Sequence, residues 1–267
     1  MAIQVTPIRA FQDNYLWLLD NGREAAVVDP GDAAPVLRYL EAHHLSLCAI
    51  LVTHHHGDHI GGLTELLARY PVPVFGPARE DIDQLTQRLS EGDTICVPGL
   101  NISFSVLDVP GHTAGHIAYV ENKMKNDIAN DAAGGMLFCG DTLFGCGCGR
   151  LFEGTAAQMS TSLGKLAALP SDTKVYCAHE YTLANIRFAQ VVEPGNRALQ
   201  ERKNTDSAKR EHDIPTLPST IALERDTNPF LRCTSADVIA AAERAAGKTL
   251  SHAQEVFGAL REWKNTF

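Results

Sequence analysis

The sequence predicts an α/β domain over residues 1–180, followed by an α-helical domain over residues 181–267. Up to about residue 180, short apolar runs with strand spacing alternate with helical segments, and several runs end directly at a histidine or an aspartate. After residue 180 the chain becomes rich in Ala, Arg, Gln and Glu and looks helical. Its 267 residues suit one large domain with a smaller one appended.

The individual elements follow from the same patterns. Strands are expected at residues 3–8, 15–19, 25–28, 48–52, 72–75, 102–109, 116–120, 136–139 and 174–178. Helices are expected near residues 36–40, 60–70, 155–169, 183–210, 235–246 and 250–264. The polar segment 121–135 predicts a long hairpin loop. The continuous apolar run 48–52 is typical of a buried strand, which would deliver the residues after it to the edge of a sheet.

Composition and charge exclude several classes of protein. Hydrophobic residues make up 45% and charged residues 21%, as in ordinary globular proteins. No run of about 18 apolar residues predicts a membrane span, and the first residues do not resemble a signal peptide. The net charge of −9 argues against nucleic acid as the main partner. We therefore expect a cytoplasmic monomer that acts on a small molecule, without a membrane or nucleic-acid partner.

The seven cysteines predict buried free thiols rather than disulfides. Their number is odd, and several lie inside apolar runs, which suits a reducing compartment. Cys146 and Cys148 form a C-x-C pair, but a single such pair is weak evidence for a metal site.

The segment 53–59, Thr-His-His-His-Gly-Asp-His, is the main chemical signal of the chain. Residues i and i+2 of an extended chain point the same way, so His54 and His56 can share one metal ion. Asp58 and His59 follow Gly57, where the chain can turn towards a second ion. So many imidazole and carboxylate groups within a few residues would be unfavourable if buried unpaired, which favours a metal site.

Three further candidates each end an apolar run: His112, Asp141 and His179. Alone, each would more often be a loop residue or a helix cap. Together they complete two groups, with Asp141 shared: His54, His56 and His112 for one ion; Asp58, His59 and His179 for the other. His55 alternates away from the ligands and is predicted not to bind metal, and His116 is predicted to be a hydrogen-bonded support.

These motifs resemble the metallo-β-lactamase superfamily. The family pattern T-H-x-H-x-D-H occurs at 53–59, G-H-T-x-G-H at 111–116, G-D at 140–141 and the last histidine at His179. The resemblance covers the first 180 residues. It implies an αβ/βα sandwich with the metal ions at one edge of the two sheets.

A narrower resemblance, to the glyoxalase II family of hydroxyacylglutathione hydrolases, covers almost the whole chain. It rests on the stretches at 140–144, 153–155, 177–182, 192–196, 217–220 and 228–232. In that family the helical domain and nearby loops bind glutathione, which implies substrate-binding roles for Arg150, Phe152, Tyr181, Arg261 and Lys264. Arg150 replaces a frequent lysine, and Phe152 replaces a frequent tyrosine and so lacks its hydroxyl. Arg261 and Lys264 are three residues apart on an expected helix, so they are predicted to form a positive patch.

The resemblance implies hydrolysis of S-(2-hydroxyacyl)glutathione, such as S-lactoylglutathione, to glutathione and a 2-hydroxy acid such as lactate, the second step of methylglyoxal detoxification. Two divalent ions are expected, zinc first and iron or manganese as alternatives. They would convert a bridging water to hydroxide for attack on the thioester carbonyl, with Asp58 and Asp141 as the catalytic residues. The alternative is an oxidoreductase of the same superfamily, similar to persulfide dioxygenase and using one iron.

Overall fold

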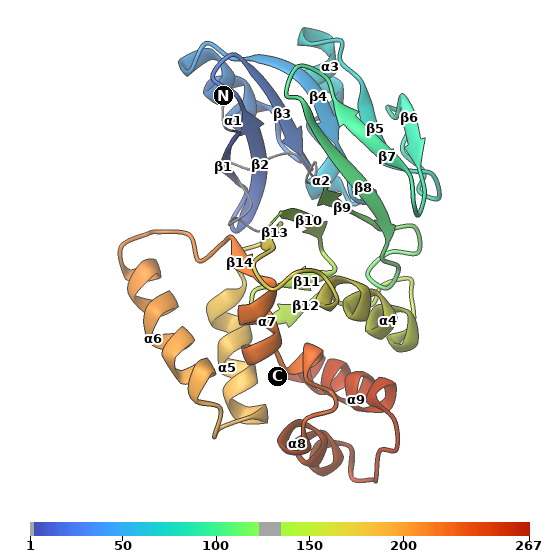
Figure 1. The fold of residues 1–267 in the computed structure, drawn as a ribbon, viewed down its shortest axis with the longest axis vertical. Coiled ribbons are helices and arrows are strands. Elements are labelled where there is room, and N and C mark those ends of the chain that lie inside the picture. The colour runs from blue at the N-terminus through green and yellow to red at the C-terminus, as the bar shows by residue number, and fades with distance from the viewer. Residues whose placement is uncertain (1–2, 123–134) are drawn as a thin grey trace.

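The computed structural model describes residues 3–122 and 135–267, and two facing β-sheets form its upper part in Figure 1. The first sheet has six strands in sequence order, β1 to β6. Their bounds are β1 Gln4–Ala10, β2 Asn14–Asp20, β3 Glu24–Val28, β4 Ser46–Leu51, β5 Val74–Pro77 and β6 Gln87–Leu89. The β1–β2 and β2–β3 pairs are antiparallel, whereas β3 to β6 are parallel. The parallel strands therefore bring their carboxyl ends to one edge.

The second sheet has the order β14-β13-β10-β9-β8-β7. Its strands are β7 Thr94–Val97, β8 Ile102–Asp108, β9 Ile117–Glu121, β10 Met136–Gly140, β13 Lys174–Cys177 and β14 Ser219–Thr220. β14 comes from the C-terminal third of the chain but pairs with β13, so the helical part contributes an edge strand to this sheet. A separate hairpin joins β11 (Leu143–Phe144) to β12 (Gly147–Cys148).

Alternating side chains of the first sheet build two cores. Trp17 and Leu19 of β2 pack towards the second sheet, in a core that includes Phe104 and Phe138. Leu16 and Leu18 point the other way and join a core formed with helices. Both faces of the sheet are buried, which explains why β2 and β4 read as continuous apolar runs rather than as alternating ones.

Helices cover the outer faces and form the C-terminal part. The first four are α1 Ala33–Ala42, α2 Gly57–Ile60, α3 Leu63–Arg69 and α4 Ala156–Ala167. The later ones are α5 Thr182–Val192, α6 Arg197–Glu211, α7 Ile221–Thr227, the 3₁₀ helix η1 Pro229–Leu231, α8 Ala236–Ala246 and α9 Ala253–Thr266. Helices α1 and α3 pack on the first sheet, and α4 belongs to the same large apolar cluster as the second sheet. Helices α5 to α9 gather at the lower end of Figure 1.

The predicted α/β class with a C-terminal helical part is confirmed. Several details differ from the expected elements, and helix α7 and the 3₁₀ helix η1 were not among them. The helix expected over 60–70 is interrupted at Gly61 and Gly62, and the one expected over 183–210 divides into α5 and α6 around Pro194, which cannot continue a helix. The short strands β6, β7, β11, β12 and β14 were not anticipated, because two to four residues carry little periodicity.

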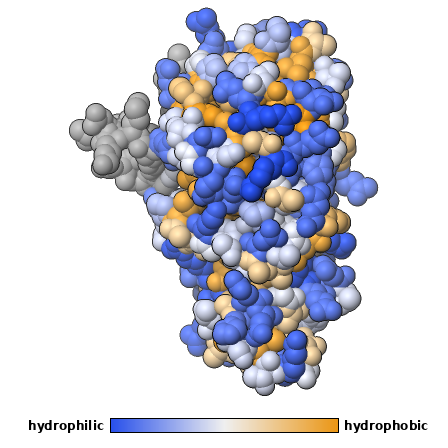
Figure 2. All heavy atoms as spheres, turned by 90° about the vertical axis from the view of Figure 1, so that its right-hand side faces the viewer, coloured by the Kyte–Doolittle hydropathy of each residue, from blue (hydrophilic) through white to orange (hydrophobic). Residues whose placement is uncertain are grey.

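The loop predicted over 121–135 mostly lies outside the described residues, which omit 123–134. β9 ends at Glu121, β10 begins at Met136, and the two strands pair antiparallel, as a hairpin connection predicts. No helix in the described part of the chain is long and apolar enough to cross a membrane. On the face shown in Figure 2, hydrophilic residues are spread over both halves, with hydrophobic ones in small groups between them.

Candidate metal centre and substrate site

The seven predicted ligands meet at one edge of the two sheets. His54, His56, Asp58 and His59 lie after β4 and on α2, His112 follows β8, Asp141 follows β10, and His179 follows β13. An isolated bridge between Asn14 and His179 ties the start of the first sheet to this edge of the second. The strand ends thus collect side chains from four distant segments.

Three imidazole rings form the first ligand group. His54 Nε2 lies 3.2 Å from His56 Nδ1, which lies 3.0 Å from His112 Nε2. These three atoms can serve as ligands to a single ion, and the residues are close enough together to hold one.

Asp58, His59 and His179 form the second group, and Asp141 lies between the groups. Asp58 Oδ2 lies 3.5 Å from both His59 Nε2 and His179 Nε2. Asp141 Oδ1 lies 3.4 Å from the same two nitrogens, whereas its Oδ2 lies 3.4 Å from His112 Nε2. The two oxygens of Asp141 therefore face different groups, as a bridging carboxylate requires.

Hydrogen bonds on the far side of each ring fix its orientation. Thr53 Oγ1 donates to Asp29, so it can accept from His54 Nδ1, 3.0 Å away. His112 Nδ1 donates to the Arg150 carbonyl at 2.9 Å, and His179 Nδ1 donates to Asp13 Oδ1 at 2.7 Å. In all three rings, the nitrogen that faces the group is left with a free lone pair. This arrangement is typical of metal-binding histidines.

The same supports extend to the second group. His59 Nδ1 lies 3.1 Å from Asp29 Oδ2. Asn14 Nδ2 donates to Asp58 Oδ2 at 3.0 Å. Asp29 thus supports a ligand of each group, because it also holds Thr53.

The electrostatics of the site suit a bound cation. Burial lowers the pKa of His54 well below its usual value, and neighbouring histidines lower it further, so its ring is neutral. Burial alone would raise the pKa of Asp141, but the charges of His59 and His179 hold it well below its usual range. Burial likewise lowers the pKa of His56 and His112, so the first group offers neutral imidazoles. In the second group the nearby carboxylates outweigh burial and raise the pKa of His59, and that of His179 to about 9.

The residues present fit two divalent ions. Ligands held about 2.0–2.1 Å from a tetrahedral ion are about 3.3 Å apart, close to the spacing in both groups. Among the described residues, His59 Nε2 and Asp141 Oδ1 are buried without a hydrogen-bond partner, and a cation in the second group would satisfy both. Nitrogen and carboxylate donors of this kind suit zinc, iron or manganese.

Phe152 and Tyr181, two of the predicted substrate residues, lie against the ligand groups. The Phe152 ring is 63% exposed and packs edge-on against His56 and His112, with centroids 5.6 and 5.2 Å apart. The Tyr181 ring stacks on His179 at 4.8 Å. Burial and nearby carboxylates raise the pKa of Tyr181, so its phenol keeps its proton at neutral pH. One aromatic side chain thus covers the edge of each group.

The charges of Arg150 and Arg261, the other two predicted cations, act on Lys264. Burial lowers the pKa of Lys264, and the charges of Arg261, Arg187 and Arg150 lower it further. Arg187 of α5 therefore belongs to the same cluster, although its sequence position gave no sign of this. Lys264 Nζ also lies over the rings of Phe188 and Phe267, at 5.5 and 5.7 Å. The result is a local positive region on an acidic protein.

Arg261, one of the two residues of the predicted positive patch, is buried. It is only 5% exposed, and its Nη1 donates to the carbonyl of Cys148 at 2.9 Å. The apolar side of α9 includes Phe257 and Leu260, and Arg261 continues that side. The guanidinium also lies 5.2 Å from the Phe230 ring centroid. Arg261 therefore holds the segment that precedes Arg150, in addition to contributing positive charge.

The remaining predictions have clear outcomes. His116 Nδ1 donates to the Ile117 carbonyl and its Nε2 accepts from the Asp141 amide at 3.1 Å, so its predicted supporting role is confirmed. All seven cysteines are free, and five are buried, with Cys48 half-buried and Cys96 exposed. Cys146 Sγ donates to Thr227 O and Cys148 lies beside Arg261, and neither belongs to a described group that could hold a metal.

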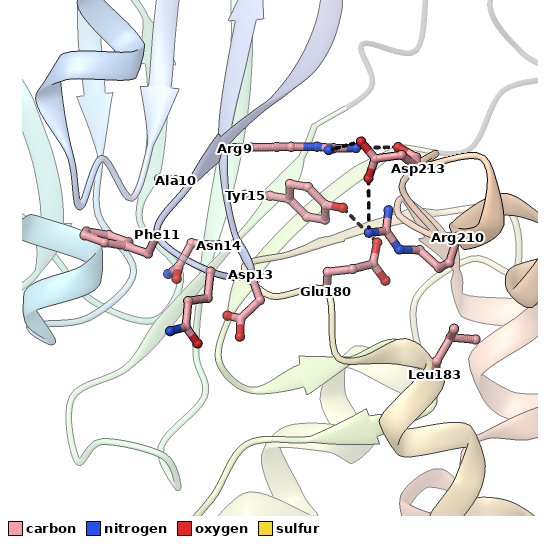
Figure 3. Close-up of a pocket in the computed structure, with 11 residues that line it drawn as sticks. Arg9, Ala10, Phe11, Asp13, Asn14, Tyr15, Glu180, Leu183, Arg210 and Asp213 are labelled. Atoms are coloured by element: carbon pink, nitrogen blue, oxygen red, sulfur yellow. Dashed lines mark hydrogen bonds and ion pairs between the residues drawn. The ribbon is translucent and has the colours of Figure 1, made fainter.

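The side chains that support the candidate ligands, those of Asp13, Asn14 and Asp29, were not predicted from the sequence. Asp29 could have been found, because it follows the apolar run of β3 directly. Asp13 lies in the β1–β2 turn and Asn14 begins β2, and only the tertiary structure brings them to the metal groups. They also form one wall of a pocket of about 360 Å³ (Figure 3), whose other walls include Arg9, Arg210 and Asp213. Both arginines contact Asp213, and no predicted ligand lines the pocket, so it lies behind the supports.

Comparison with known proteins decides the family. The model of the metallo-beta-lactamase superfamily matches residues 11–179, and the model named hydroxyacylglutathione hydrolase C-terminus matches residues 180–267. Proteins named hydroxyacylglutathione hydrolase from Cupriavidus taiwanensis and Nitrosomonas europaea are 56% and 52% identical. Those matches cover 99% of this chain and 99% and 97% of the relatives. The chain belongs to the hydroxyacylglutathione hydrolases. This family is glyoxalase II, as its motifs indicated.

Solved structures agree with this fold. ETHE1 from Myxococcus xanthus has a TM-score of 0.63 and 25% identity, covering 98% of this chain and 90% of that one. TTHA1623, solved in a di-iron-bound form, has a TM-score of 0.57 and 25% identity, covering 85% of this chain and all of that one. A B3 metallo-beta-lactamase, BLEG-1, is 23% identical with a TM-score of 0.60, covering 86% of this chain and 99% of that one, and shares the fold alone. The hydroxyacylglutathione hydrolases therefore share a metallo-β-lactamase framework.

Proposed function

We propose that this chain hydrolyses the thioester of S-(2-hydroxyacyl)glutathione, releasing glutathione and a 2-hydroxy acid. One observation carries the proposal. A group of three histidines and a group of one aspartate and two histidines, joined by Asp141, lie at the sheet edge of a chain more than 50% identical to hydroxyacylglutathione hydrolases over 99% of its length. S-lactoylglutathione, with lactate as the product, is the proposed substrate.

The seven predicted ligands are proposed to hold two divalent ions, zinc in the first instance. When bound, such ions polarise a carbonyl oxygen and lower the pKa of water. Asp141 is proposed to fix the distance between the two groups. Asp58, held at Oδ2 by Asn14, is proposed to orient the attacking water. The leaving group is a thiolate, so a strong general acid is less necessary.

Residues 1–180 are proposed to carry the metal centre, and residues 181–267 most of the glutathione site. β14 of the second part pairs with β13 of the first. Glutathione has two carboxylates, and Arg150, Arg261 and Lys264 are the proposed cations for them. Phe152 and Tyr181 are proposed to line the path to the thioester, which their contacts with both ligand groups support. We further propose a cytoplasmic location, where free thiols stay reduced.

The test is hydrolysis of S-lactoylglutathione by metal-loaded and chelator-treated protein, measured as released thiol. We expect turnover with two ions bound, loss on chelation and recovery when zinc, iron or manganese is restored. Comparing the three metals identifies the best cofactor. Oxygen uptake with a glutathione persulfide is measured in parallel. Oxygen uptake without thioester hydrolysis would favour the one-iron oxidoreductase instead.

A further inference from the structure

Glu80 is a buried carboxylate that joins two loops of the metal centre. It lies shortly after β5 and is 5% exposed. Its Oε2 accepts from the His55 amide at 2.8 Å and also contacts His55 Nδ1. Its Oε1 accepts from Thr113 Oγ1 at 2.5 Å and from the Gly115 amide at 2.9 Å. Four donors from two loops therefore converge on one side chain.

The two loops that Glu80 joins carry the whole of the first ligand group. His55 lies between His54 and His56, and Thr113 directly follows His112. The second group has supports of its own: Asn14 holds Asp58, Asp29 faces His59, and Asp13 holds His179. Loss of the Glu80 contacts should therefore affect the two groups unequally.

Local packing shows that the Glu80 contact is built into the loop. A Cβ added at Gly115 would lie 2.7 Å from Glu80 Cγ and 2.8 Å from the Arg79 carbonyl carbon, so only glycine lets the loop approach this closely. The exposed Glu153 forms a second bridge between the same loops. Its Oε1 lies 3.3 Å from His55 Nε2, and its Oε2 accepts from the Ala114 amide at 2.8 Å.

We propose that Glu80 is a positioning residue for the ion held by His54, His56 and His112, acting through His55 on one side and through Thr113 and Gly115 on the other. It fixes the separation of His56 Nδ1 and His112 Nε2, which come from different loops. His55 is the one histidine of segment 53–59 outside both ligand groups. In this proposal it links Glu80 to the adjacent His54 and His56.

The isosteric change Glu80→Gln tests this proposal. An amide has one acceptor oxygen and two N–H donors. It can still accept from one loop, but its NH₂ group then faces the donors of the other. One loop must therefore lose its backbone-amide hydrogen bond to this side chain, while the size of the side chain is preserved.

Metal affinity is measured by chelator competition in two backgrounds that isolate the groups. In His179→Ala, which leaves the first group intact, Glu80→Gln should weaken Zn²⁺ binding about 10- to 100-fold, as is typical for support residues. In His112→Ala, which leaves the second group intact, Glu80→Gln should weaken Zn²⁺ binding by less than about threefold, well below the usual effect of a support residue. With wild-type ligands, excess Zn²⁺ should restore the lost turnover.

Two matched controls accompany the variant. Asp81→Asn, at the exposed neighbour, should leave both affinities unchanged, and Glu153→Gln should have a smaller effect than Glu80→Gln because Glu153 is exposed. If Glu80→Gln does not fold, Thr113→Val removes only one of the four hydrogen bonds, the one from Thr113 Oγ1. Equal weakening of both groups, or none in the first, would overturn the proposal. The inference rests on the proposed metal centre but not on the substrate, because the titrations contain no thioester.

Discussion

Asp141 is the residue on which the proposed two-ion arrangement depends. Its oxygens face different ligand groups, and Oδ1 is buried without a hydrogen-bond partner among the described residues. The Asp141 amide donates to His116, so the backbone that carries the carboxylate is fixed as well. A buried carboxylate with an unsatisfied oxygen is unfavourable unless a cation is nearby.

Replacing Asp141 by alanine should therefore remove metal and activity together. We expect fewer than two ions per chain by elemental analysis. The catalytic rate should fall by more than the roughly 10- to 100-fold typical of a supporting residue. Asp172→Asn, at an exposed aspartate, is the control and should retain both ions. Two tightly bound ions in Asp141→Ala would contradict the bridging role.

At the scale of elements, side chains of the helical part hold the segment 144–149 in place. Asn185 Nδ2 donates to Gly145 O, Glu224 accepts from the Cys146 amide, and Asn228 Nδ2 donates to Gly147 O. Arg261 completes the set at Cys148 O. This segment leads to Arg150, whose carbonyl fixes the His112 ring. The helical part therefore helps to shape the candidate metal centre as well as the proposed substrate site.

Asn228→Ala tests this coupling. Asn228 is fully buried, and its loss leaves Gly147 O and Glu224 with one donor fewer. The free energy of unfolding should fall by about 1–3 kcal/mol, the usual effect of an unsatisfied buried group. It is measured by urea denaturation of the metal-loaded protein. Thioester hydrolysis by the folded variant should also fall.

The control for this prediction is Asn204→Ala, on the exposed side of α6, which should change neither quantity. Reduced stability with unchanged hydrolysis would show that the helical part supports the segment without positioning the site.

The convergence of the seven candidate ligands could be predicted from the sequence, because each follows an apolar run and strand ends meet at one sheet edge. Glu80 could not, because it follows the four-residue strand β5 and reaches His55 and Thr113 only through tertiary packing. The burial of Arg261 left a signal, since it lies four residues after buried Phe257 on α9. The break between α5 and α6 also left one, in Pro194. Both segments are rich in charged, helix-forming residues. That composition hid the burial of Arg261 and the helix break at Pro194.

At the scale of the whole molecule, the substrate and the protein have charges of the same sign. The chain carries −9, and a glutathione thioester carries carboxylates. Binding therefore requires local cations that overcome the overall repulsion. Arg150, Arg187 and Arg261 supply positive charge around Lys264. The lowered pKa of Lys264 reflects both its burial and the repulsion from these cations. An anionic ligand would relieve that repulsion.

Replacing Arg150 and Lys264 together by glutamine tests whether they bind the glutathione thioester. Arg261 is left in place, because its hydrogen bonds to the segment before Arg150 would confuse binding with folding. The Arg150 side chain is exposed, and its carbonyl bond to His112 survives the change. Both cations should contribute mainly to uniform binding, so KM for S-lactoylglutathione should rise with little change in kcat. Charge-assisted contacts contribute roughly 1.5–3 kcal/mol when well formed and less when exposed, so an increase of about tenfold is expected for the pair.

Two measurements separate this effect from general damage. The difference in KM between wild type and variant should shrink as salt is added, because salt screens exposed charges. A small neutral thioester without carboxylates should be hydrolysed equally well by both proteins. An unchanged KM for the glutathione thioester at low salt would rule out Arg150 and Lys264 as its binding residues. An equal loss with the neutral thioester would instead point to damage at the metal centre, most directly through the Arg150 carbonyl that fixes His112.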